Sequence, residues 1–381
     1  MDWLGTLVAL VLILGVFIDA FEVMLLPRRV RHSYRLARLY YRSAWMCWRG
    51  LAKLYRVGRW RNGFLSIFGP LSLFGLLSIW AAGLIVGFAL LHWSLGTVLT
   101  TDHEPVKDFG SVLYFSGSTF FTLGYGDVSP VGVLGRVLSV MEAGIGFGFL
   151  ALVISYLPIL YQAFSRREIT ISLLDARAGS PPSAGELLMR FGRSRSLANI
   201  APLLAEWEQW AAQLLESHVS FPVLSYYRSQ HDNQSWVGAL TTILDTSALV
   251  IAGIDGTDDH QARVTFAMAR HAAVDLGLVF RSSPRPLEQD RLTVAELELL
   301  RESLRSAGLP VREGPAVAKS LTELRALYEP FVNALSAFFL FPLPPFRATT
   351  APVDNWQTSP WMQRSPGLES LPGPSERDEH L

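Results

Sequence analysis

Three long apolar segments in the first half of the chain limit what it can fold into. Each contains at most two acidic or basic side chains, and a helix of about 20 apolar residues spans the ~30 Å core of a bilayer. The segments are residues 3–26, 64–93 and 131–164. The sequence therefore predicts an all-α membrane protein with three transmembrane helices.

The charges between these segments predict their orientation. Residues 28–61 hold ten arginines, one lysine and no acidic residue, whereas residues 94–108 hold one lysine and three acidic residues. Basic loops are retained on the cytoplasmic side. We therefore expect the N-terminus and residues 94–130 outside, and the chain after the third span inside. Because residues 1–27 lack a basic start and a cleavage site, we expect a first transmembrane helix rather than a signal peptide.

The basic segment itself, residues 28–63, is predicted to form an interfacial helix. Its basic residues recur at intervals of three, four or seven, which places them on one helical face. The other face offers Leu36, Leu39, Tyr40, Leu51 and Leu54. A voltage sensor would carry its arginines within an apolar span, which this segment lacks. We expect residues 28–61 to lie on the anionic lipids of the cytoplasmic leaflet.

A glycine-containing motif lies between the second and third spans. Residues 111–130 read SVLYFSGSTFFTLGYGDVSP and are too short to cross the membrane and return as two helices. We predict a re-entrant pore helix at 109–121, whose C-terminal dipole favours a cation, followed by an extended loop. Thr119 and Thr122 precede Gly-Tyr-Gly-Asp, and here the sequence resembles the potassium channel superfamily. The closest resemblance is to bacterial members with a helix–pore-loop–helix unit, and it covers about residues 64–164.

This resemblance implies a potassium filter. Backbone carbonyls replace the water shell of the ion, and glycines adopt the positive φ angles that aim those carbonyls at one axis. Ser118 and Thr119 would end the pore helix, Tyr125 would pack against it, and Asp127 would attract cations at the outer mouth. A single copy of the motif implies a homotetramer. The implied filter residues are Thr122, Leu123, Gly124, Tyr125 and Gly126, with K⁺ bound at the first four.

The third span contains candidates for gating. By the resemblance, Gly146 lies at the hinge of the inner helix, with Gly144 and Gly148 as neighbouring candidates. Close helix packing is the alternative role for such small residues. Glu142 is an ionisable residue within a span and therefore a functional candidate. It could line the cavity, tie the inner helix to the pore helix near Ser118, or simply be hydrogen-bonded behind the filter.

Two acidic residues of the first span are expected to form structural ion pairs. Asp19 and Glu22 lie near its inner end, where each could pair with Arg28 or Arg29. Such pairs would be structural and carry no function of their own.

The second half of the chain is predicted to be an all-α cytoplasmic domain. Two capping boxes, at Ser183–Glu186 and Thr293–Glu296, mark helix starts. Further helices are expected over residues 201–218, 234–254, 258–279 and 316–341. The expected domains are 1–27 (first transmembrane helix), 28–63 (interfacial helix), 64–164 (pore domain), 165–182 (linker), 183–341 (helical domain) and 342–381 (disordered tail).

The sequence predicts an ion channel rather than an enzyme. No Gly-x-Gly-x-x-Gly motif follows a strand, so a nucleotide ligand is not expected. No catalytic constellation or cofactor is expected, and the scattered His218 and His231 are more typical of ordinary hydrogen bonding than of a metal site. We expect a tetrameric potassium channel of a bacterial inner membrane, without nucleic-acid partners, whose helical domain biases the gate through an unidentified ligand. The alternatives are a non-conducting membrane-anchored sensor or scaffold, and a poorly selective cation channel.

Overall fold

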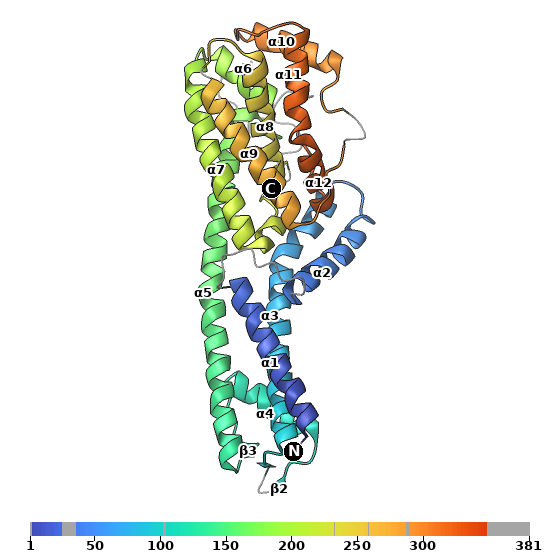
Figure 1. Ribbon diagram of the computed structural model, residues 1–381, viewed down its shortest axis with the longest axis vertical. Helices are drawn as coiled ribbons and strands as arrows, with labels where there is room; N and C mark the ends of the chain where they lie inside the picture. The colour runs from blue at the N-terminus through green and yellow to red at the C-terminus, as the bar shows by residue number, and fades with distance from the viewer. Residues whose placement is uncertain are drawn as a thin grey trace, which may run out of the picture. The chain divides into compact units, whose positions relative to one another are not determined.

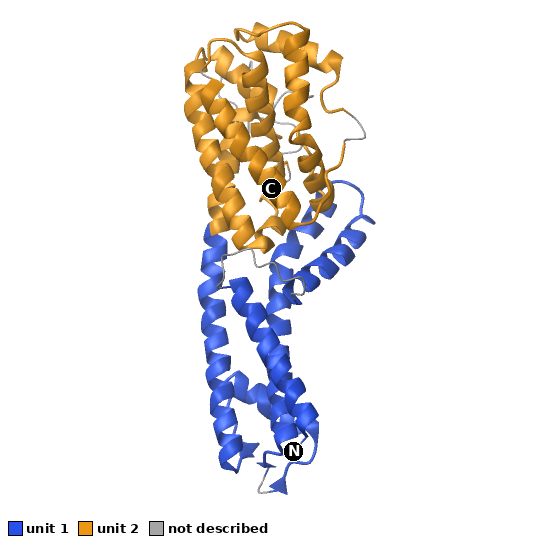
Figure 2. Ribbon diagram, in the orientation of Figure 1, with its two compact units in different colours: residues 1–162 blue, residues 163–381 orange. Residues whose placement is uncertain are grey.

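The computed structural model describes residues 2–24, 36–101, 104–231, 233–257, 259–286 and 290–348. The chain divides into two compact units, residues 1–162 and 163–381, which Figure 2 colours separately. Both units are helical, and the protein is an all-α, multi-pass membrane protein. Helices α1, α3, α5 and α8 are long and apolar enough to cross a membrane.

The first unit is built around α3 (Arg59–Leu95), against which α1 (Trp3–Met24), α2 (Leu36–Ala52) and α4 (Phe109–Phe120) pack (Figure 1). Two glycines of α3 allow α1 to approach closely, because a Cβ atom on Gly83 would meet Val16 and one on Gly87 would meet Ile13. Close approach through small residues is the usual way in which membrane helices associate.

Asp19 joins three helices of the first unit. It is buried in α1 and accepts hydrogen bonds from the Trp80 indole nitrogen of α3, at 2.8 Å, and from the Ala37 backbone nitrogen of α2, at 3.0 Å. A buried carboxylate needs such donors to offset its lost hydration. The expected partners, Arg28 and Arg29, lie outside the described residues.

The basic segment departs from the single helix predicted over residues 28–63. Helix α2 ends at Ala52, and α3 already begins at Arg59; residues 28–35 lie outside the described part. Helices α2 and α3 therefore form a helical hairpin, which aromatic packing explains. The ring of Trp48 stacks on that of Phe64 with 4.4 Å between the ring centroids, and the ring of Trp45 packs edge-on against that of Phe68 at 4.9 Å. Four leucines of the predicted apolar face stay exposed: Leu36, Leu39, Leu51 and Leu54.

A small antiparallel sheet of order β2-β1-β3 closes the end of the first unit. Its strands are β1 (Leu99–Thr101), β2 (Glu104–Pro105) and β3 (Ser129–Pro130). The pairing of Leu99 with Pro130 ties the end of α3 to the chain that leaves the glycine-containing loop. This sheet was not predicted, because strands of two or three residues are too short to show a periodic pattern.

Helix α5 (Val133–Ala178) begins in the first unit and ends in the second. It therefore includes most of the linker predicted at 165–182. Ile171, Leu174 and Ala178 are buried within the second unit, and this apolar stripe at helical spacing explains why the helix continues. Only residues 179–182 form the predicted break.

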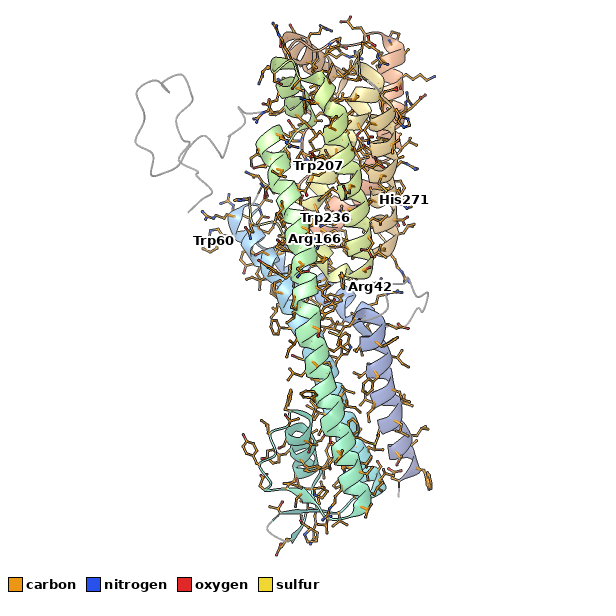
Figure 3. All side chains as sticks on the ribbon, turned by 90° about the vertical axis from the view of Figure 1, so that its left-hand side faces the viewer. Arg42, Trp60, Arg166, Trp207, Trp236 and His271 are labelled. Atoms are coloured by element: carbon orange, nitrogen blue, oxygen red, sulfur yellow. The ribbon has the colours of Figure 1, made fainter. Side chains whose placement is uncertain are left out.

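The second unit is a helical bundle around α8 (Trp236–Gly253). Helix α8 is almost entirely buried by its own unit, which explains why it resembles a membrane span in composition. Trp207 of α7 and Trp236 of α8, labelled in Figure 3, are among its largest fully buried side chains. The other helices are α6 (Ala184–Arg193), α7 (Ile200–Ser220), α9 (Asp259–Val279), α10 (Val294–Ser306), α11 (Pro315–Ala326) and α12 (Glu329–Phe339), with short 3₁₀ turns at Leu197–Asn199 and Pro222–Tyr226.

Two boundaries of the second unit differ from the prediction. The helix expected over 316–341 is two helices, α11 and α12. Pro330 lies in the first turn of α12, where its missing N–H leaves no helical hydrogen bond unmade. The tail predicted to be disordered from residue 342 is described as far as residue 348, and it contributes to the core as far as Phe346. There the buried Phe346 ring lies under the guanidinium groups of Arg291 and Arg325.

Candidate functional site: the pore loop

The pore helix α4 agrees closely with the predicted range. Asp108 caps it by accepting hydrogen bonds from the backbone nitrogen and the hydroxyl of Ser111, both at 2.8 Å. Val112 and Phe115 of α4 form a cluster with Ala89 and Leu99. The cap and this cluster fix α4 against α3, so that the loop after Phe120 starts from a rigid element.

The loop after α4 has an alternating backbone. The φ angle is positive at every second residue: 55° at Thr122, 60° at Gly124 and 82° at Gly126. The loop begins with two hydrogen bonds to the end of α4, from the Thr122 nitrogen to the Thr119 carbonyl and from the Leu123 nitrogen to the Ser118 carbonyl. Residues that alternate in handedness turn successive carbonyls to one side, which is the arrangement a cation needs.

The side chains of the loop make few contacts within the chain. Leu123 is 56% exposed and Tyr125 is 70% exposed. Most of the Tyr125 side chain is thus uncovered within the single chain. The packing of Tyr125 against the pore helix, which the resemblance implied, stays a prediction. Asp127 lies close enough to Tyr114 of α4 to raise the pKa of the Tyr114 hydroxyl.

A buried polar cluster lies beside α4. Glu142 of α5 is fully buried and accepts a hydrogen bond from Ser116 of α4, whose hydroxyl also contacts the Ile85 carbonyl of α3 at 2.7 Å. His92 of α3 places its Nε2 atom 3.8 Å from the other Glu142 oxygen. Neither of these two facing atoms has a hydrogen-bond partner among the described residues.

This cluster decides between the roles considered for Glu142. A fully buried carboxylate does not line a cavity within the chain. Its contact with Ser116, two residues before Ser118, ties the inner helix to the pore helix, which is one of the alternatives considered, and His92 adds the outer helix to the cluster. His92 and Ser116 were not predicted as site residues. Each is a single polar residue in a helix that is recognised from its apolar residues alone, so nothing in the sequence pattern marks it.

The three glycines of α5 lie in different surroundings. A Cβ atom on Gly146 would overlap the carbonyl of Phe120, at the end of the pore helix, whereas one on Gly144 or Gly148 would meet nothing. Close packing therefore accounts for Gly146, and helix α5 is continuous through all three positions. Their role as a gating hinge stays a prediction.

Much of the apolar surface of α5 is uncovered by its own chain. Exposed side chains include Val133, Val137, Val140, Phe147, Leu150 and Ile154. Lipid or neighbouring copies of the chain can cover such a surface in a membrane, where apolar exposure carries no penalty from water.

The surroundings of His218 are polar and buried. No group of three potential metal ligands occurs in the described ranges. His218 is buried with its Nε2 atom 3.2 Å from the Arg167 guanidinium, which also donates to the Leu224 and Tyr227 carbonyls. Burial, and then the charge of Arg167, lower the pKa of His218 well below its usual value, so the ring is a neutral hydrogen-bond acceptor.

The pore loop and its helices define an ion-channel pore unit. Residues 77–163 match the family model described as "Ion channel", which confirms the resemblance stated from the sequence over that segment. The match spans the end of α3, the pore helix, the loop and the part of α5 in the first unit. The part of the chain after residue 163 lies outside it.

Three relatives share parts of the chain. The uncharacterized membrane protein YdjJ of Bacillus subtilis is 25% identical over 213 residues, which are 56% of this chain and 60% of that protein. Two-pore potassium channel 3 of Arabidopsis thaliana is 40% identical over 76 residues, 18% of this chain and 17% of the relative. Protein LctB of Bacillus caldotenax is 32% identical over 85 residues, 20% of this chain and 63% of the relative.

The chain thus covers less than two thirds of the length of each of these relatives. No solved structure matches it. The family model, and among these relatives the two-pore potassium channel, support an ion-channel pore over the segment that they match.

Proposed function

We propose that the chain is one subunit of a tetrameric, potassium-selective channel. The observation that carries the proposal is the loop Thr122–Asp127, in which positive φ angles recur at Thr122, Gly124 and Gly126. Four such loops around one axis would present the carbonyls of Thr122, Leu123, Gly124 and Tyr125 as stacked rings of ligands for dehydrated K⁺. Asp127, at the end of this loop, would concentrate cations at the entrance.

The single chain leaves exposed the surfaces that a tetramer would use. The side chains of Leu123 and Tyr125 have little cover, and α5 exposes apolar residues along its length. A fourfold ring would place these surfaces against neighbouring subunits. Chemical crosslinking of the purified protein should give a ladder that ends at four subunits. A ladder that ends at two would contradict the tetramer, because a dimer provides only two loops.

Ion flux separates the proposal from its two alternatives. Proteoliposomes that contain the protein should release K⁺ down its gradient, and Ba²⁺ should block the release. Absence of flux from correctly folded tetramers would favour the non-conducting scaffold. Reversal potentials with K⁺ on one side and Na⁺ on the other test selectivity, and a value near zero would favour the poorly selective cation channel.

We further propose a bacterial inner-membrane location with the N-terminus outside and the second unit in the cytoplasm, as the basic segment indicates. The basic helix α2 would then contact anionic lipid through its arginines and the exposed Leu36, Leu39 and Leu51. Cysteine accessibility tests the orientation. The natural Cys47 of α2 is exposed and should react with a membrane-impermeant maleimide only in inside-out vesicles.

The helical second unit would bias the gate. Helix α5 carries the inner end of the pore unit into the second unit as one continuous helix, so a ligand that prefers one state of the bundle can shift the pore equilibrium. The experiment is to compare the open probability of the full chain with that of a chain lacking the second unit.

A further inference from the structure

The hydrogens available in the buried cluster beside α4 restrict how it can be protonated. The Ser116 hydroxyl contacts two oxygens, the Ile85 carbonyl of α3 at 2.7 Å and a carboxyl oxygen of Glu142. A hydroxyl group donates one hydrogen, and a backbone carbonyl donates none. Both contacts are therefore filled by a hydrogen of their own only if Glu142 supplies the second one.

Two arrangements of the cluster follow from this count. With a proton on Glu142, the carboxylic acid donates to Ser116, and Ser116 donates to the Ile85 carbonyl. With a charged carboxylate, Ser116 donates to Glu142, and no hydrogen remains for its contact with Ile85. The proton on Glu142 thus decides whether the pore helix α4 is hydrogen-bonded to the outer helix α3 at this point.

The surroundings of Glu142 hold no cation that would balance a carboxylate permanently. Its second oxygen faces the Nε2 atom of His92 at 3.8 Å, which is longer than a hydrogen bond. In α3 no charged side chain lies between residue 62 and His92, and the titratable Tyr114 of α4 is exposed. The charged side chains nearest along the neighbouring elements are exposed and hydrogen-bonded elsewhere: Asp2 before α1, Asp108 before α4 and Arg136 in α5.

His92 connects the cluster to the surface of the unit. Its Nδ1 atom lies 2.9 Å from the hydroxyl of Thr97, a partly exposed residue just after α3. The imidazole ring can take up a proton at Nδ1 and release another from Nε2 to Glu142. In this step an N–H bond forms at Nδ1, the N–H bond at Nε2 breaks, and an O–H bond forms on the carboxyl group. The facing atoms approach from 3.8 Å to about 3 Å for the transfer.

We propose that Glu142 binds a proton delivered through Thr97 and His92, and that this proton bonds the pore helix to the outer helix through Ser116. The ring of His92 is neutral before and after the delivery, so no charge stays buried beside the acid. A water molecule next to the facing atoms would shorten the step and leave the count of hydrogens at Ser116 unchanged.

Infrared spectroscopy of the purified full chain tests for the bound proton. A protonated carboxylic acid has a carbonyl stretching band that a carboxylate lacks. This band should appear in the difference between the spectra of the parent and Glu142→Gln. Glu104→Gln is the matched control, because Glu104 is an exposed acidic residue of the same unit, and its spectrum should keep the band. A spectrum in which Glu142→Gln removes no such band would overturn the proposal.

A second variant keeps the acid and changes only its partner. Ser116→Ala should shift the band, because the carboxylic acid loses the oxygen to which it donates. This variant decides the matter if Glu142→Gln fails to fold. A band at the same position in Ser116→Ala and in the parent would show that the proton is not shared with Ser116.

Exchange of the acid proton for deuterium tests the delivery route. His92→Phe retains a ring for the edge-on packing against Phe115 but has no nitrogen to carry a proton. It should slow the deuterium shift of the acid band about 100-fold or more, the usual contribution of a positioned proton-transfer group. Trp93→Phe, at the next and exposed position, is the control. Equal exchange rates in the two variants would exclude His92 from the route.

The proton site stands independently of ion conduction, because the acid band is measured without flux. Its role in gating rests on the proposed function. K⁺ flux of the parent should then depend on pH, and at acidic pH it should equal the flux of Glu142→Gln, whose amide is a permanent donor to Ser116. An acid band in a conducting channel whose flux ignores pH would refute the gating role alone, whereas an acid band in a non-conducting protein would refute the channel alone.

Discussion

Thr122, Gly124 and Gly126 have positive φ angles and alternate with residues of ordinary φ. The steric cost of a positive φ differs between threonine and glycine. Thr122 adopts a positive φ despite its Cβ, whereas the two glycines occupy the following positive positions without steric cost. The Thr122 nitrogen is bonded to the Thr119 carbonyl, which helps to hold that residue in its strained conformation. Gly124 has no such support in the described chain, so its conformational freedom is the feature most sensitive to substitution.

Gly124→Ala should abolish K⁺ flux. A Cβ atom at a φ of 60° costs about 1–2 kcal/mol in each subunit and favours a loop conformation that turns a carbonyl away from its ring. Flux from proteoliposomes measures the effect. Gly132→Ala is the control, because Gly132 lies just beyond the loop, has an ordinary φ and leaves open space for a Cβ atom. Selective flux through Gly124→Ala would show that the loop is not the filter.

The contacts of Glu142 with Ser116 and His92 could be learned only from the structure. Glu142→Ala should destabilise the first unit by about 1–3 kcal/mol, because the Ser116 hydroxyl loses its carboxylate acceptor and a buried cavity forms. Glu142→Gln retains an oxygen acceptor for Ser116 and should cost less. SDS-induced unfolding measures the difference. Met141→Ala, at an exposed position of the same helix, is the control, and an equal loss there would contradict a specific role for the cluster.

At the scale of helices, Gly146 of α5 lies directly against the carbonyl of Phe120 at the end of α4. Gly146→Ala should separate the inner helix from the end of the pore helix, because the added Cβ would overlap the Phe120 carbonyl. We expect a lower thermal midpoint together with reduced flux. Gly144→Ala, two residues earlier, has room for the methyl group and should resemble the parent protein. If Gly146→Ala instead keeps its stability and changes only the open probability, the hinge role is favoured over packing.

The elements that sequence could predict are those whose pattern is local. The pore helix, the capped start of α10 at Thr293 and the long apolar helices follow from periodicity and caps, and the structure contains them. Contacts distant in sequence were not predictable: Asp19 with Trp80, or Glu142 with Ser116 and His92. The continuation of α5 through the expected linker was not predicted, because two arginines, Arg166 and Arg167, directly follow the apolar segment. In the structure Arg167 is buried against carbonyls of its own unit.

At the scale of the whole molecule, the two units are compact by themselves, and their boundary at residue 162 lies within α5. The residues of α5 beyond that boundary belong to the second unit, where Ile171, Leu174 and Ala178 are buried. Two truncated chains that differ by only a few turns of helix are therefore expected to differ in solubility. One ends with the first unit, and the other retains a helix whose covering partners have been removed.

A chain of residues 1–162 should assemble into tetramers and conduct K⁺, with an open probability different from that of the full chain. A chain of residues 1–182 should aggregate, because the stripe formed by Ile171, Leu174 and Ala178 loses the helices that cover it and becomes exposed to water. Size-exclusion chromatography in detergent distinguishes the two, and bilayer recordings compare the shorter one with the parent. A shorter chain that gates like the full protein at every pH and voltage would remove the regulatory role of the second unit. A soluble, tetrameric chain of 1–182 would show that the buried stripe of α5 does not depend on the bundle.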